Sequence, residues 1–349
     1  MTFTPTFIKR LAATGSVLAV LTVGVAACTS TSTESAPSTA ATDTSTETTD
    51  SVDSTDSSDS TTETAAATAE SPTLEELVAE VAGEFSQVEW TDPDTGEVLT
   101  YNIYLPEDYD ETQSYPLVVY IPDSSLVGDD PTAALSQYGA LIWASETQQA
   151  QSESIVVVPA FPEVILDDHD SFTMTEYVEM TARLVEDLTG EYAVDTDRVY
   201  GTGQSMGAMT IMYLAAQYPD LFAAEMIVSG QWDITQLSGL ADETFVYTAA
   251  AGDEKASTGQ TDVEAMLDAA GVSYNTALFD ATWSDEESAA AAEELLSSGD
   301  SAYFLTFAEG TVLEAGDSSS EMGGEHMASF QPAYEIAGLR TWLFEQTAS

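Results

Sequence analysis

The chain has 349 residues, of which 61 are acidic, 6 are basic and 2 are histidines, so its formal net charge is -55. This charge excludes nucleic acid and anionic lipid head groups as partners, because both repel a polyanion. The single cysteine excludes an intrachain disulfide. The single cysteine and the two separated histidines do not form a cluster of transition-metal ligands in the sequence, so we expect neither a metal nor a cofactor.

The N-terminus has the features of an export signal. Lys9 and Arg10 precede an apolar stretch, residues 11–27, that ends in small residues directly before Cys28. This arrangement is similar to a bacterial lipoprotein signal peptide. Residues 1–28 therefore predict export, with lipidation of Cys28 anchoring the protein to the outer face of a bacterial cell membrane. An uncleaved anchor is the alternative, because the apolar stretch is marginally long enough to span a bilayer.

Two further segments differ sharply in composition. Residues 29–71 are almost entirely Ser, Thr, Ala, Asp and Glu, without an aromatic side chain. Such a segment buries too little apolar surface to offset the entropy of ordering, so we expect a disordered acidic tether. Residues 72–349 are long enough for one domain with a full core.

Strand and helix patterns alternate along residues 72–349. Continuous apolar runs predict strands that are buried on both faces, as in a parallel sheet. We therefore expect an α/β fold, with a mostly parallel central sheet, helices on both faces and N-terminal antiparallel strands. Residues 280–299 form either a cap over the site or a surface excursion. The expected strands are 87–90, 98–105, 117–121, 155–159, 198–201, 223–229, 244–251 and 303–307, and the expected helices are 74–85, 135–145, 173–188, 206–218, 263–270, 284–296 and 331–344.

The sequence Gly-Thr-Gly-Gln-Ser-Met-Gly at 201–207 contains a G-x-S-x-G motif between a predicted strand and a predicted helix. A sharp turn there lifts the Ser205 hydroxyl clear of the backbone, and Gly203 and Gly207 prevent collisions across the turn. The motif predicts Ser205 as a nucleophile. The N–H of Met206, at the start of the helix, is placed to stabilise an oxyanion.

Chain order indicates the partners of this serine. In hydrolases with this turn the acid and then the histidine follow the serine, and of the two histidines only His326 does so. Asp253 follows the strand 244–251 and is the candidate acid, with Glu254 as its nearest competitor. His169, among aspartates, is interpreted as a solvated loop residue at the rim of the site.

These motifs resemble the α/β-hydrolase serine esterases and peptidases related to polyhydroxybutyrate depolymerases and prolyl-oligopeptidase catalytic domains. The resemblance rests on 115–123, 197–207, 218–224, 252–256 and 325–327, and it spans residues 85–346. It implies the α/β-hydrolase fold, a Ser205, His326 and Asp253 triad, and hydrolysis of an ester or amide bond. Many relatives carry His-Gly-Gly after the first central strand, where this chain has Pro122, which has no N–H. The second oxyanion donor is therefore expected from Asp123, Ser124 or a neighbour.

Three further residues are candidates for contact with the substrate. Gln231 and Trp232 follow a predicted strand at the sheet edge where ligands bind, although Trp232 is equally consistent with a packing role. Lys255 adjoins Asp253 and either binds an anionic group of the substrate or pairs with nearby carboxylates. We expect a serine hydrolase that cleaves small or medium carboxylic esters through an acyl-enzyme, so the expected partner is a small-molecule substrate, either an ester or a peptide. A peptidase or amidase of the same fold is the first alternative, and a catalytically silent binding lipoprotein is the second.

Overall fold

The computed structural model describes residues 71–169, 171–316 and 324–348. The predicted signal peptide, Cys28 and almost all of the predicted tether therefore lie outside the described residues. Among the helices that are described, none is both long enough and apolar enough to cross a bilayer.

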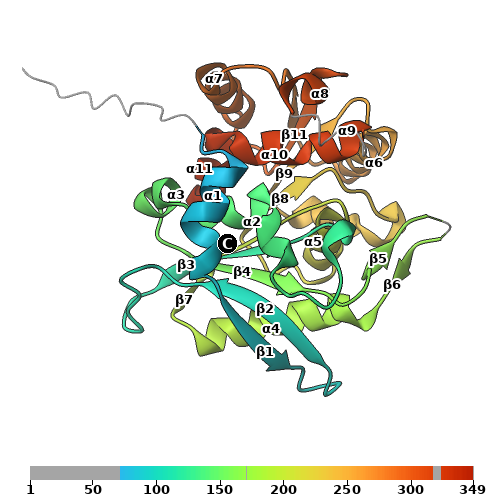
Figure 1. Cartoon of the computed structure of the whole chain (residues 1–349). Coiled ribbons are helices and arrows are strands. Elements are labelled where there is room, and N and C mark those ends of the chain that lie inside the picture. The colour runs from blue at the N-terminus through green and yellow to red at the C-terminus, as the bar shows by residue number, and fades with distance from the viewer. Residues whose placement is uncertain (1–70, 170, 317–323, 349) are drawn as a thin grey trace, which may run out of the picture. The chain divides into compact units, whose positions relative to one another are not determined.

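A nine-stranded sheet forms the centre of the domain, with the strand order β1-β2-β4-β3-β7-β8-β9-β11-β10 (Figure 1). β2 pairs antiparallel with β1 and with β4, and the other neighbours pair in parallel. The α/β fold with N-terminal antiparallel strands is thus confirmed. The strands of this sheet are β1 (Ser86–Thr91), β2 (Val98–Tyr104), β3 (Tyr115–Ile121), β4 (Ile155–Ala160), β7 (Val194–Gln204), β8 (Ala224–Val228), β9 (Phe245–Ala250), β10 (Tyr274–Phe279) and β11 (Ala302–Phe307).

Helices cover both faces of this sheet because its central strands are apolar on both sides. All seven residues of β3 are buried, and alternate residues belong to two separate hydrophobic clusters. On the first face pack α4 (Glu176–Glu191), α5 (Met206–Gln217) and α6 (Glu254–Ala270). On the second face pack α1 (Leu74–Val81), α2 (Tyr138–Leu141), α7 (Asp285–Leu296), α10 (Phe330–Glu335) and α11 (Ala337–Glu345). Three further short helices are α3 (Glu146–Gln151), α8 (Thr311–Ala315) and α9 (Gly324–Ala328).

Two predicted helices are broken in the structure. The segment 135–145 contains only the single turn α2 between 3-10 turns, because Gln137 before α2 is extended, and Ser145 is extended and caps α3. An apolar run that is buried on all sides carries no helical period. The segment 331–344 divides into α10 and α11 at Ile336, which is extended. The Tyr334 carbonyl, which an unbroken helix would pair internally, accepts a hydrogen bond from Arg340 instead.

Other predicted boundaries were wrong by part of an element. α1 ends at Val81, earlier than predicted, and a 3-10 turn follows it. α6 begins at Glu254 rather than 263, because Asp253 caps its N-terminus and its first turns are polar and largely exposed. In the segment 173–188, the first two residues form strand β6 (Thr173–Met174), which pairs with β5 (Leu166–Asp167). Strand β10 was not predicted, since its burial pattern is mixed.

The segment 280–299 is a surface excursion in this structure. Its helix α7 packs against α11 and β10, and none of its residues lines the pocket described below.

Candidate active site

The predicted nucleophile turn is present between β7 and α5. Ser205 has φ 52° and ψ -117°, a backbone conformation that is strained for a residue with a side chain. A Cβ on Gly203 would lie 2.6 Å from the backbone of Gly207, and one on Gly207 would lie 1.9 Å from the Ile121 carbonyl oxygen. The turn therefore requires glycine at both positions, as the motif predicted.

The three predicted catalytic side chains form one hydrogen-bonded chain. Ser205 Oγ lies 2.9 Å from His326 Nε2, and His326 Nδ1 lies 2.6 Å from Asp253 Oδ2. Asp253 is buried, whereas the side chain of His326 is 34 % exposed. In this order the imidazole can take the serine proton while the carboxylate orients the ring. Glu254, the competing candidate for the acid, makes no hydrogen bond to His326 in the described structure.

A local contact with the backbone holds the carboxylate of Asp253, the acid of the triad, in position. Asp253 is the N-cap of α6, and its other oxygen, Oδ1, accepts a hydrogen bond from the Ala256 N–H at 3.3 Å. One carboxylate thus caps a helix and holds the imidazole at the same time. The position at the end of β9 was predicted, but the capping contact was not.

The short helix α9, which carries His326, is held by residues that the sequence did not single out. Glu325 accepts hydrogen bonds from the N–H groups of Gly252 at 3.0 Å and Gly310 at 2.9 Å. On the other side, Ser329 Oγ donates to the His326 carbonyl at 2.8 Å and lies 2.6 Å from Ser229 Oγ. Apart from the local bond between Ser329 and His326, these contacts join residues 15 to 100 positions apart, so local patterns gave no signal for them.

Backbone N–H groups suitable for an oxyanion lie beside Ser205. Met206 is the first residue of α5, so its N–H has no acceptor within the helix. In the facing loop, the Ser125 N–H donates to the Asp123 carboxylate at 2.7 Å and the Leu126 N–H to the Asp123 carbonyl at 3.4 Å. Within the described residues no acceptor is recorded for the N–H of Asp123 or Ser124, so the second donor is expected from these two. The Asp123 carboxylate itself is bound by the side-chain amides of Gln204 and Gln137.

Comparison with known proteins gives the family. Residues 93–306 match the family described as "Putative esterase". The chain belongs to this esterase family. A dipeptidyl-peptidase 5 of Porphyromonas gingivalis is 26% identical over 159 residues, which are 43% of this chain and 22% of that protein. Acetylxylan esterase A of Aspergillus ficuum is 47% identical over 49 residues, or 14% of this chain and 16% of that protein. The chain therefore spans less than a quarter of the length of either relative.

The solved structures support the fold. A thermostable esterase has a TM-score of 0.56 at 22% identity, with 76% of this chain and 64% of that chain covered. The predicted α/β-hydrolase fold and the resemblance to esterases and peptidases are thus confirmed.

A pocket of about 430 Å³ opens at Ser205 in this esterase-family domain. Five apolar side chains and a set of polar ones line it, and the predicted residues Asp123, Ser124, Met206, Gln231 and Lys255 are among the lining residues. Trp232 is not: it is buried against Phe172, with ring centroids 5.1 Å apart, so the packing interpretation holds for it. The apolar lining residues are Val164, Leu166, Met206, Met209 and Met327.

One wall of the pocket is the β5–β6 hairpin, which was not predicted. Asp168, directly after β5, accepts hydrogen bonds from Lys255 Nζ at 2.7 Å and from the Gln231 side-chain amide. Lys255 on α6 and Gln231 in the loop after β8 therefore hold the hairpin over the site. The same ion pair means that Lys255 is paired with a carboxylate of the protein, the second of the two roles predicted for it.

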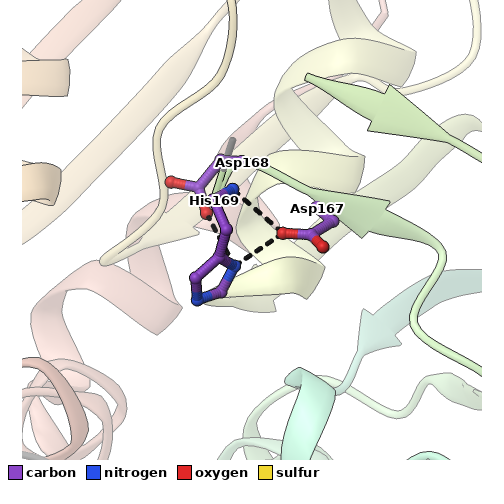
Figure 2. A group of neighbouring side chains, drawn as sticks. All are labelled: Asp167, Asp168 and His169. Atoms are coloured by element: carbon purple, nitrogen blue, oxygen red, sulfur yellow. Dashed lines mark hydrogen bonds and ion pairs between the residues drawn. The ribbon is translucent and has the colours of Figure 1, made fainter. Parts of the chain in front are cut away.

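His169 lies at the rim of the pocket, as expected. Figure 2 shows its ring turned toward Asp167, with Nδ1 2.6 Å from the carboxylate, and Asp168 beside them. These three side chains offer ligand atoms within 4.8 Å of one another. Asp168 is already bound by Lys255, and the His169 ring bonds to Asp167. The described contacts are those of a hydrogen-bonded rim, and they give no independent indication of a metal.

Proposed function

We propose that this protein is a serine hydrolase that cleaves carboxylic esters through an acyl-enzyme. The observation that carries the proposal is the chain from Ser205 through His326 to Asp253, with distances of 2.9 and 2.6 Å, at the mouth of a pocket. Ser205 attacks the ester carbonyl, and His326 takes its proton and then gives it to the leaving alcohol. Water then attacks the acyl carbonyl with His326 as base, the bond between the acyl carbon and Ser205 Oγ breaks, the carboxylic acid leaves, and Ser205 regains its proton from His326.

The oxyanion formed in each step needs donors that are in place beforehand. We propose the Met206 N–H and one N–H from Asp123 or Ser124 for this role. The Asp123 carboxylate would oppose an oxyanion, but three hydrogen bonds from Gln137, Gln204 and Ser125 disperse its charge. The apolar lining residues would receive an acyl group of small or medium size. Membership of the esterase family favours esters over peptides.

Labelling with a fluorophosphonate tests the proposal. We expect the full-length protein to be labelled, and the Ser205→Ala and His326→Ala variants to lose labelling. Ser273→Ala, an exposed serine bonded to Asp300, is the matched control and should be labelled like the wild type. A folded wild type that is not labelled would favour a silent binding protein.

The choice between ester and amide needs a pair of substrates. We expect p-nitrophenyl acetate to be hydrolysed at a kcat/KM at least about 100-fold higher than the corresponding p-nitroanilide, a difference of about 2.7 kcal/mol in the barrier. Comparable values would support a peptidase instead, which is the activity named for the Porphyromonas gingivalis relative.

We further propose that the enzyme acts at the outer face of a bacterial membrane, attached through a lipid on Cys28. The support for this is the sequence of residues 1–71 alone. Metabolic labelling with an alkyne fatty acid tests it, since Cys28→Ser should abolish incorporation. Incorporation that persists in Cys28→Ser would contradict the proposed anchor.

A further inference from the structure

A second pocket lies on the other face of the sheet, away from Ser205. Its volume is about 230 Å³, and its lining includes Ile142, Trp283, Phe307, Ile336 and Arg340. The lining residues come from several elements of the second face, among them α7, α10 and α11 (Figure 1). The proposed hydrolysis makes no use of this pocket.

A buried cation forms part of its wall. Arg340 is 6 % exposed, its Nε donates to Gln148 Oε1 at 3.0 Å, and its Nη1 donates to the Tyr334 carbonyl. A guanidinium carries five N–H groups, so these two contacts leave most of its donors unused. For Nη2 no acceptor is recorded within the described residues.

The other basic side chains in the described part of the chain are all paired with carboxylates. Arg183 binds Asp92 at 2.8 Å, Arg198 binds Asp195 at 2.7 Å and Lys255 binds Asp168 at 2.7 Å. In the same residues no carboxylate oxygen lies within 4.0 Å of Arg340. Removing a cation from water is costly unless a counter-charge replaces the lost hydration. Desolvation accordingly lowers the pKa of Arg340.

The two acidic residues in the lining, Asp285 and Glu335, act on Arg340 through their charges but accept their hydrogen bonds from other groups. Asp285 accepts from the Ser71 N–H at 2.9 Å and from its hydroxyl at 3.3 Å. Glu335 accepts from the Gln331 amide at 2.7 Å, and burial raises its pKa, which weakens its opposition to an anion. Their remaining charge still disfavours a dianion such as phosphate. A ligand with one negative charge and an apolar body matches the pocket best.

We propose that this pocket binds a small organic monocarboxylate. Its carboxylate pairs with the free edge of the Arg340 guanidinium, and its apolar body packs among Trp283, Phe307 and Ile336. The pocket is smaller than the about 300 Å³ at the lower end of sites for drug-sized ligands, which limits the ligand to a small molecule. The proposal stands independently of the proposed esterase function.

Benzoate and hexanoate are the probes, tested on the full-length protein. At about ten times Kd we expect either probe to raise Tm by about 2–4 °C, with a saturable change in tryptophan fluorescence. Benzamide, which has the shape of benzoate without its charge, is the control and should give no shift. Wild-type protein that responds to neither carboxylate overturns the proposal.

Two variants locate the site. Arg340→Gln removes the charge, and we expect at least a tenfold loss of affinity. Because this change also disturbs the contact with Tyr334, Ala289→Phe is a second variant that leaves Arg340 intact and fills the pocket, where Ala289 is a lining residue. It should abolish the response. Benzoate that still stabilises Ala289→Phe binds elsewhere, for example beside Ser205, and that result also overturns the assignment.

Discussion

The stability of this protein should fall with rising pH because of two buried glutamates. Glu225 lies on the central strand β8 with no exposed surface, and neither of its carboxyl oxygens has a partner within the described residues. Burial, with the nearby charge of Glu243, raises the pKa of Glu225 well above its ordinary value. Burial also raises the pKa of Glu243 to about 8, with Asp242 and Asp220 adding to the effect.

The direction in which stability changes with pH follows from proton linkage. An unfolded glutamate ionises near 4.5, whereas folded Glu243 keeps its proton until about 8. Between these values the native state binds more protons than the unfolded state, so the free energy of unfolding decreases as pH rises. At about 1.4 kcal/mol per pH unit, the difference between about 8 and 4.5 gives an upper limit of about 5 kcal/mol. Relaxation around the ionised group reduces this, and we expect about 2–4 kcal/mol.

Glu243→Gln tests this, because glutamine has the same shape and stays neutral. We expect the variant to match the wild type at pH 5 and to be more stable by about 2–4 kcal/mol at pH 9, as measured by urea unfolding. Glu286→Gln, an exposed residue on α7, is the control for removing one charge. Exposed carboxylates are ionised by about pH 6, so a loss between pH 6 and 9 reports carboxyls with a raised pKa, and the Glu243→Gln variant gives the part due to Glu243. A wild type with constant stability over that range would refute the reasoning.

Three substitutions test the site. Gly207→Ala should lower Tm by more than about 5 °C and reduce fluorophosphonate labelling, while Gly190→Ala, whose Cβ would meet nothing within 4 Å, should leave both almost unchanged or raise Tm slightly. Asp168→Asn removes the ion pair with Lys255, so KM for bulky esters should rise about tenfold at constant kcat; an equal fall in kcat would contradict a role in shaping the pocket. Glu325→Gln weakens the hydrogen bonds that hold α9 and His326 in place, so kcat should fall about tenfold at unchanged KM, with correct folding verified by circular dichroism.

The sequence predicted the residues that meet at Ser205 because each carried a separate signal. The strained turn requires glycines at fixed positions, and only one histidine follows the serine. The choice of Asp253 as the acid rested on its position after a buried strand. This signal is weaker than the other two, because Glu254 adjoins Asp253. The structure distinguishes them through the bond to His326.

The supporting contacts were beyond sequence reasoning. Glu325 binds backbone N–H groups of two other loops, and Ser329 contacts the hydroxyl of the distant Ser229. Serines and glutamates are common throughout this chain, so neither residue carried a signal. The β5–β6 hairpin has strands of only two residues, too short for a period-2 pattern. Similarly, the break at Ile336 depends on Arg340, whose bond to the Tyr334 carbonyl replaces a helical hydrogen bond.

The few basic residues of this acidic chain lead to a single physical conclusion. With 61 acidic residues against 6 basic ones, most cations of this chain have carboxylates available as partners. Arg183 and Lys255 show this, since each joins two elements through a carboxylate. Arg340 is the most deeply buried of the described basic residues, and it has the greatest need of a counter-charge. Asp285 and Glu335 act on it through their charges but form no ion pair with it, and this leaves its guanidinium available for the carboxylate that we propose.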